Sequence, residues 1–128
     1  MENIKTHRSI NQDLCGNPIQ LTAGYAEIEM KASAEMAVDE KQLVHGGFVF
    51  GLADHAAMIA VNDPNVVLGA AQCMFKKPVK VGDTIVAKAT VSNSKNNKRF
   101  VYVAVLKGDE EVFQGEFTCF ILDKHVLD

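Results

Sequence analysis

An alternation of apolar and polar side chains predicts a strand near the start of the chain. Small or apolar residues alternate there with charged ones, in the order Ala26, Glu27, Ile28, Glu29, Met30, Lys31 and Ala32. Successive side chains of a strand point to opposite faces, so this strand has one buried and one solvated face. The preceding residues 1–20 show no clear period and end in the turn signal Gly16-Asn17-Pro18, which predicts an N-terminal extension of undefined structure.

Residues 45–62 have a different pattern, which predicts one long helix. Two glycines begin the segment, Asn62-Asp63-Pro64 ends it, and nearly every residue between them is apolar. Proline stops a helix, and about 17 residues rising about 1.5 Å each form a rod of roughly 25 Å. Because the segment is apolar almost all round, we expect this helix to be buried.

Four further strands are predicted after the helix. They cover residues 66–75, 84–91, 100–106 and 112–122, with turn residues at 92–97 and 108–110. Short connections of this kind are typical of antiparallel neighbours. The order of elements predicts an α+β fold in which a curved antiparallel sheet wraps around one long central helix. The 128 residues suffice for a single domain with one core, residues 1–128.

The polar residues of the predicted helix gather on one side of a helical wheel. At about 100° per residue, one arc holds Gly47, Gly51, Asp54, His55, Met58 and Asn62, and the opposite arc is apolar. Burial of a lone carboxylate is unfavourable unless the group is paired or neutralised. Asp54 is therefore either paired with His55 or with a basic residue of another subunit, or it is a general base whose pKa is raised in a partly dry cleft.

Two segments of the chain resemble a known family. His45-Gly46-Gly47 followed by Leu52-Ala53-Asp54 is similar to the helix motif of the phenylacetyl-CoA thioesterase branch of the hotdog superfamily. The segment from Phe75 to Asp83 resembles the strand-turn-strand segment of the same family, and the similarity covers roughly residues 20–122. The resemblance implies a hotdog fold and hydrolysis of acyl-CoA thioesters.

The resemblance also implies roles for particular residues. Asp54 takes the position of the family's general base or nucleophile, and the backbone N–H of Gly46, with Gly47 beside it, takes the position of the oxyanion donor. The first N–H groups of a helix have no partner within the helix, which suits them to this role. His45 either orients the loop or contacts substrate. Asp39 departs from the pattern, because family members carry an Asn six residues before the His.

Further contacts to an acyl-CoA substrate are expected on the helix and at a cluster of basic residues. On the helix, Phe50, His55 and Met58 are the expected substrate contacts, together with Asp39 before it. Lys98 and Arg99 are the first candidates for binding the phosphates of CoA, and Lys76 and Lys77 are the next. No metal site is expected, because His45, Asp54 and His55 lack the usual ligand spacing. CoA enters only as part of the substrate, and no separate cofactor is predicted.

Composition and charge narrow the range of partners. The formal charge is −3 and there is no tryptophan, which argues against nucleic acid or an anionic membrane as the main partner. Three widely spaced cysteines, Cys15, Cys73 and Cys119, are expected to be reduced thiols. The N-terminus is polar, and the longest apolar run, 48–61, is shorter than the ~20 residues of a membrane span. These features predict a cytoplasmic protein.

Two functions from different classes are compatible with these patterns. The first is an acyl-CoA thioesterase that works as a homodimer or a dimer of dimers. The second is a non-catalytic acyl-CoA-binding or sensing protein of the same fold. The chain also resembles, more loosely, the effector domain of the malonyl-CoA-sensing repressor of bacterial lipid synthesis, in Ala34-Glu35-Met36, Phe75 to Val79 and Ala87-Lys88-Ala89. Asp54 favours the enzyme, whereas Asp39 is compatible with a binding protein.

Overall fold

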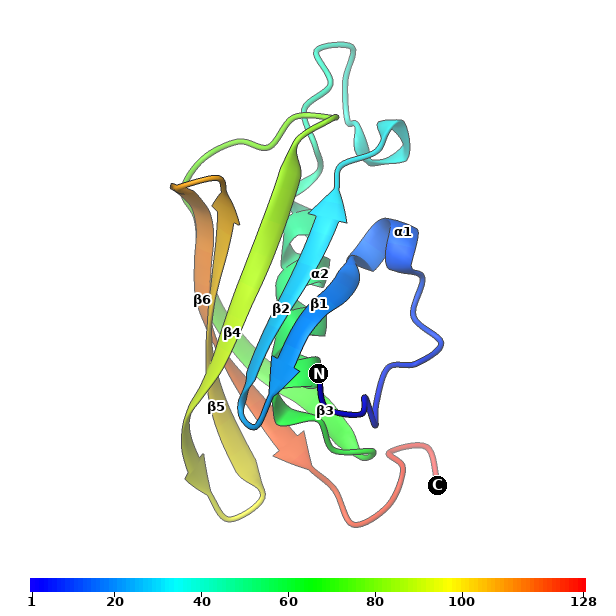
Figure 1. The fold of residues 1–128 in the computed structure, drawn as a ribbon, viewed down its shortest axis with the longest axis vertical. Helices are drawn as coiled ribbons and strands as arrows, with labels where there is room; N and C mark the ends of the chain where they lie inside the picture. Colours follow the sequence, from blue (N-terminus) through cyan, green and yellow to red (C-terminus); the bar gives the residue numbers. More distant parts are fainter.

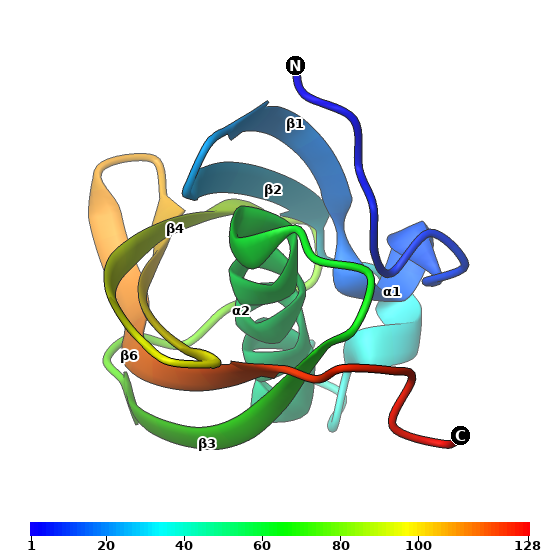
Figure 2. The same cartoon turned by 90° about the horizontal axis from the view of Figure 1, so that it is seen from below.

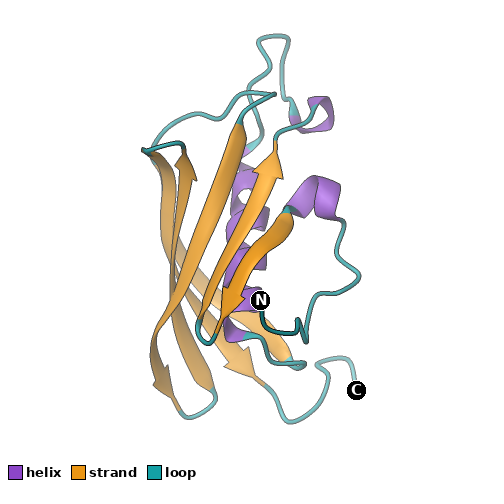
Figure 3. Cartoon of the chain, in the orientation of Figure 1, coloured by secondary structure: helices purple, strands orange, loops and turns teal.

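The computed structural model describes residues 1–128 as one antiparallel sheet wrapped around a long helix (Figures 1 and 3). The strands are β1 (Asn17–Thr22), β2 (Tyr25–Lys31), β3 (Val66–Phe75), β4 (Thr84–Lys95), β5 (Lys98–Lys107) and β6 (Glu110–Ile121). The helices are α1 (Gln12–Cys15), a 3-10 turn (Ala34–Met36) and the central α2 (Gly46–Val61). The six strands are arranged in the order β1-β2-β4-β5-β6-β3, and every neighbouring pair is antiparallel.

Seen from one end, the sheet curls around α2 (Figure 2). The apolar side of the helix packs on β2, β4 and β5, and Leu52, Ala53, Ala56 and Ile59 are fully enclosed there. Together with the inward-facing residues of the strands they form a single core of 27 buried residues. The predicted α+β architecture, a hotdog fold with α2 at its centre, is confirmed.

The structure corrects the sequence-based prediction at two strands. Asn17 does not lie in a turn but begins β1, the strand missed in residues 1–20. Pro18 is tolerated because β1 is an edge strand. Gly16 has a φ of +92° and packs so closely on α2 that an added Cβ would lie 2.6 Å from the Leu52 side chain, so glycine suits this position. The second correction concerns β4, which continues to Lys95 and shortens the predicted turn at 92–97 to two residues.

The N-terminal segment, residues 1–16, crosses the C-terminal half of α2 and is held there by hydrogen bonds. The Lys5 backbone N–H donates to Asn62 Oδ1 at 2.8 Å, and Asn62 Nδ2 donates to the Asn3 carbonyl at 2.8 Å. Asn62 is the C-cap of α2 in the left-handed conformation, so one residue both ends the helix and fixes the segment. The extension of undefined structure is therefore an ordered cover over one end of α2.

On the other side of α2 the structure leaves a face uncovered. The strand β3 pairs only with β6, and its residues 69–75 are exposed on both faces. No charged side chain occurs in β3, and beside it Gly47 is exposed while Gly51 is half-buried on α2. A long, uncharged edge strand is a typical site for pairing with another chain. None of the helices combines the length and apolar character that crossing a membrane requires.

Candidate active site

The N-terminus of α2 presents one free backbone donor. His45 is the N-cap, and its Nδ1 accepts the N–H of Gly47 at 2.7 Å. The N–H of Gly46 donates to no group of the chain. It lies beside a cavity of about 350 Å³ that is lined by Val44, Gly46, Val49, Phe75, Lys76, Lys77, Pro78 and Val79. Gly46 therefore has a backbone N–H that is free to bind a ligand, whereas the N–H of Gly47 is already used by His45.

Asp54 lies in the middle of α2 and has no partner within the chain. The side chain is half-buried, and its Oδ1 is inaccessible to solvent without any hydrogen bond. Desolvation by burial raises the pKa of this carboxyl to about 6. Pairing with His55, one of the alternatives that the sequence left open, does not form. Asp54 is thus an unpaired carboxylate that can take up a proton near neutral pH.

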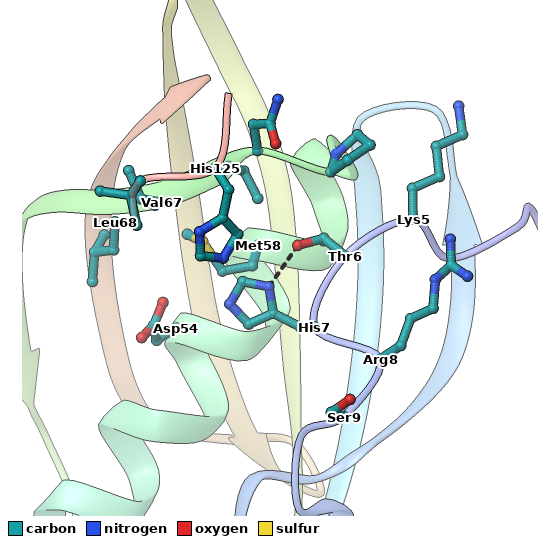
Figure 4. A pocket seen from close by; sticks show the side chains of 14 residues that line it. Lys5, Thr6, His7, Arg8, Ser9, Asp54, Met58, Val67, Leu68 and His125 are labelled. Atoms are coloured by element: carbon teal, nitrogen blue, oxygen red, sulfur yellow. Dashed lines mark hydrogen bonds between the residues drawn. The ribbon is translucent and has the colours of Figure 1, made fainter. Parts of the chain in front are cut away.

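A second cavity, of about 580 Å³, contains Asp54 (Figure 4). Its walls come from the N-terminal segment 5–9, from α2, from the start of β3 and from the C-terminal tail. The side chains of His7, His125 and Met58 surround the hollow into which Asp54 points. Residues far apart in the sequence thus meet around the only carboxylate of the cavity.

His55 and Met58 are placed differently from the expectation of an open arc. Both are almost fully buried, and only Met58 lines the Asp54 cavity. His55 turns toward α1, where its Nδ1 lies 2.9 Å from the carbonyl oxygen of Cys15. A carbonyl oxygen can only accept, so this ring nitrogen donates, and burial lowers the pKa of His55. The helical wheel could not predict the burial of His55 and Met58, because it does not show that the N-terminal segment covers the C-terminal half of α2.

Asp39 shapes a loop before α2. Its Oδ1 accepts the backbone N–H groups of Lys41 at 3.0 Å and Leu43 at 3.2 Å, and it lines neither cavity. Phe50 packs on the sheet, and the centre of its ring lies 6.5 Å from the ring centre of Phe113 and 5.5 Å from that of Phe117. The structure therefore gives both residues a packing or turn-forming role within one chain.

Lys98 and Arg99 are not brought to either cavity. They begin β5 at the β4–β5 hairpin, and Lys98 pairs in register with Phe120 of β6, so that a strand separates it from β3. The Lys98 Nζ lies 5.6 Å from the centre of the Phe120 ring, and the Arg99 guanidinium donates to the carbonyl of Asn96. Lys76 and Lys77 line the same cavity as Gly46, and Lys76 forms an ion pair with Glu111.

Sequence reasoning missed the residues that close the Asp54 cavity. Thr6, His7 and His125 come from segments without periodicity, where only the presence of histidine could have drawn attention. No group of three or more His, Cys, Asp or Glu side chains is arranged to hold a metal ion. The three cysteines form no disulfide.

Gly46 and Asp54 cannot act on one carbonyl group within a single chain. They are eight residues apart on a straight helix, which corresponds to about 12 Å along its axis. The oxyanion donor and the carboxylate must each lie about 3 Å from the reacting group. Within one chain the surroundings of Gly46 and those of Asp54, here called the two half-sites, are therefore separate.

Comparison with known proteins identifies the family. Residues 41–114, more than half of the chain, match the family model of the thioesterase superfamily. The chain therefore belongs to this superfamily, as the helix motif and the fold predicted.

Two curated relatives cover nearly the whole chain. The methylthioribose-1-phosphate isomerase of Aquifex aeolicus is 53% identical over 94% of the chain, and the transcription factor FapR of Thermoanaerobacter sp. is 33% identical over 98%. The chain spans 26% of the first protein and 64% of the second. The FapR match agrees with the looser resemblance found in the sequence.

Solved structures share the fold. The uncharacterized protein PH1136 from Pyrococcus horikoshii is 53% identical, with a TM-score of 0.98 and coverage of 99% of this chain and 98% of its own. The PaaI protein from the phenylacetic acid degradation operon of E. coli has a TM-score of 0.83 at 24% identity, and covers 93% of this chain and 88% of its own. The likeness to PaaI shows the fold alone.

Proposed function

We propose that this chain hydrolyses acyl-CoA thioesters, with Asp54 as the catalytic carboxylate. The observation that carries the proposal is the unpaired Asp54, which points into a cavity and whose pKa is raised to about 6 by burial. A structural carboxylate would be paired, whereas a general base needs a pKa near the working pH. Membership of the thioesterase superfamily supports the same chemistry.

In the proposed reaction the oxygen of water bonds to the thioester carbonyl carbon while Asp54 takes one proton of the water. The negative charge that develops on the carbonyl oxygen is stabilised by the N–H of Gly46. The carbon–sulfur bond then breaks and its electron pair stays on sulfur. The sulfur takes up the proton that Asp54 had accepted, so that CoA leaves as the thiol, and the carboxylic acid product releases its own proton to the solvent as a carboxylate. Asp54 as a direct nucleophile gives the same products through an anhydride.

The complete site is proposed to form between two copies of the chain. An antiparallel pairing of β3 with its own copy, centred at Ala71 or Gln72, places Leu68 of one chain beside Phe75 of the second copy. Leu68 lines the Asp54 cavity and Phe75 lines the Gly46 cavity. The pairing therefore joins the two half-sites, covers the exposed edge of β3 and produces two equivalent sites in a closed dimer.

A proposed CoA path follows from the same arrangement. Lys77, together with Lys76 in its ion pair, borders the Gly46 cavity, so these two lysines rather than Lys98 and Arg99 are the candidates for the CoA phosphates. Because exposed charges are screened by salt, CoA binding is expected to weaken as ionic strength rises.

The second candidate function is binding of an acyl-CoA without hydrolysis. The observation in its favour is the 33% identity to the transcription factor FapR over 98% of the chain. Asp39, which forms a turn rather than facing either cavity, is compatible with this function as well.

One assay separates the two functions. The pure protein is incubated with short, long and aromatic acyl-CoAs and a thiol reagent, and binding is measured in parallel by calorimetry. Release of CoA thiol in proportion to protein supports the enzyme. Tight binding of an acyl-CoA without thiol release would establish the binding protein instead.

A further inference from the structure

His7 lines the Asp54 cavity and has a backbone conformation that is unusual for a residue other than glycine. Its φ is +55°, in the left-handed region, where only a few per cent of non-glycine residues occur. The chain is held in this turn by the Ile10 N–H, which donates to the His7 carbonyl at 3.3 Å, and by the nearby tie between Lys5 and Asn62. Strain of this kind persists where the surroundings impose it, and it often marks a functional position.

The His7 ring is also fixed in orientation. Its Nδ1 lies 2.7 Å from the hydroxyl oxygen of Thr6, and Thr6 is itself buried. Figure 4 shows this hydrogen bond and the ring directed toward the hollow that Asp54 also faces. With Nδ1 occupied by Thr6, the other ring nitrogen is the one left to exchange protons with groups in the cavity.

We propose that His7 is a second acid–base residue of this site, which carries the proton from Asp54 to the departing sulfur of CoA, with Thr6 as its positioning residue. This role rests on the proposed thioesterase function. It gives the N-terminal segment a catalytic purpose beyond covering the helix.

The proton and electron balance of the step is complete. Asp54 takes a proton from the attacking water and passes it to neutral His7. The carbon–sulfur bond breaks with its electron pair on sulfur, and the His7 imidazolium then protonates the sulfur to give the CoA thiol. Asp54 is again a carboxylate and His7 is again neutral, so the pair is ready for another cycle without any further reactant.

The charges around His7 suit this exchange. The titratable and charged groups that share its cavity or lie close to it are Asp54 and His55 on α2, His125 in the tail, and Lys5 and Arg8 in its own segment. Burial, and then the neighbouring His55, lower the pKa of His7, so its ring is neutral at pH 7. Burial also raises the pKa of Asp54 to about 6, so both groups of the cavity are shifted in the direction that favours their neutral forms.

The test uses His7→Asn, because asparagine tolerates positive φ and can still accept a hydrogen bond from Thr6. The expected result is a fall in kcat of about 10²-fold or more with unchanged affinity for acyl-CoA, and loss of one limb of the pH–rate profile. Asp13→Asn, in the same segment but outside the cavity, is the matched control and should keep the parent kcat.

A second measurement does not depend on turnover. The ring of His7 is titrated by NMR in the parent and in Asp54→Asn. Removal of the carboxylate should lower the pKa of His7 by about 0.5 unit or more if the two groups exchange a proton.

The outcomes separate this inference from the proposed function. If the parent hydrolyses acyl-CoA and His7→Asn keeps full activity, the role of His7 is overturned and the thioesterase function stands. The same holds if the pKa of His7 does not change in Asp54→Asn. Absence of hydrolysis by the parent overturns the proposed function and this role together.

Discussion

Asp54 combines burial with the absence of any partner, and this has a consequence for stability. The pKa of its carboxyl rises from the ordinary value of 3.8 to about 6 on folding, so the folded state holds the proton more tightly than the unfolded state. Stability is therefore lost as pH rises from about 4 to about 6 and is constant above that range. The ionised form of Asp54 therefore destabilises the fold, as expected of a functional rather than a structural carboxylate.

Asp54→Asn tests this account of the residue. The amide cannot ionise, so the variant should melt at a higher temperature than the parent at pH 7, and the difference should shrink toward pH 4. Thermal unfolding of both proteins at several pH values measures it. A variant that is less stable at pH 7 would show that Asp54 is paired in the working assembly.

At the residue scale the sequence predicted some positions and missed others. The wheel placed Asp54 with Gly47 and Gly51 on an open side of the helix, and the structure confirms this because helical geometry alone determines the angle. It placed His55 there as well, but His55 contacts Cys15. Long-range packing of an aperiodic segment cannot be read from local periodicity.

At the scale of the elements, α2 is the best predicted part of the chain. The expected helix 45–62 is observed as Gly46–Val61, capped by His45 and Asn62, because the apolar run and the proline beyond it specify both ends. β1 was missed because its six residues, NPIQLT, mix polar and apolar side chains and include a proline. Its place at the edge of the sheet depends on pairing with β2 rather than on its own pattern.

The N-terminus of α2 allows a direct test of the oxyanion donor. Gly46→Pro removes the backbone N–H, and proline is favoured at the first position of a helix. His45, at φ −60° and ψ 131°, already has the conformation required before proline. We expect kcat to fall by about 10²- to 10³-fold.

Gly46→Ala is the matched control for this prediction. It introduces the same Cβ, about 3.2 Å from the Phe75 ring, but keeps the N–H. The alanine variant should therefore retain most of the activity that the proline variant loses. Equal losses in the two variants would show that the Cβ, and not the missing donor, is responsible.

For the whole molecule, the proposed dimer predicts that each active site takes Asp54 from one chain and Gly46 from the other. Mixing Asp54→Asn with Gly46→Pro by co-expression tests this sharing. Random pairing makes about half of the dimers mixed, each with one intact site, so about a quarter of the parent activity should return. Each variant alone should be nearly inactive.

The same experiment can contradict the shared site. If Asp54 and Gly46 of one chain worked together, every site in the mixture would carry a defect and no activity would return. Two different affinity tags, one on each variant, allow mixed dimers to be purified in two steps, so a negative result is informative.

The role of Asp54 in thioester hydrolysis is tested by kcat of Asp54→Asn on the best acyl-CoA, with the affinity for that compound measured on the same sample. We expect a folded variant that binds acyl-CoA as the parent does and whose kcat falls by about 10²-fold or more. A folded variant that releases CoA at the parent rate per molecule would rule out a catalytic Asp54.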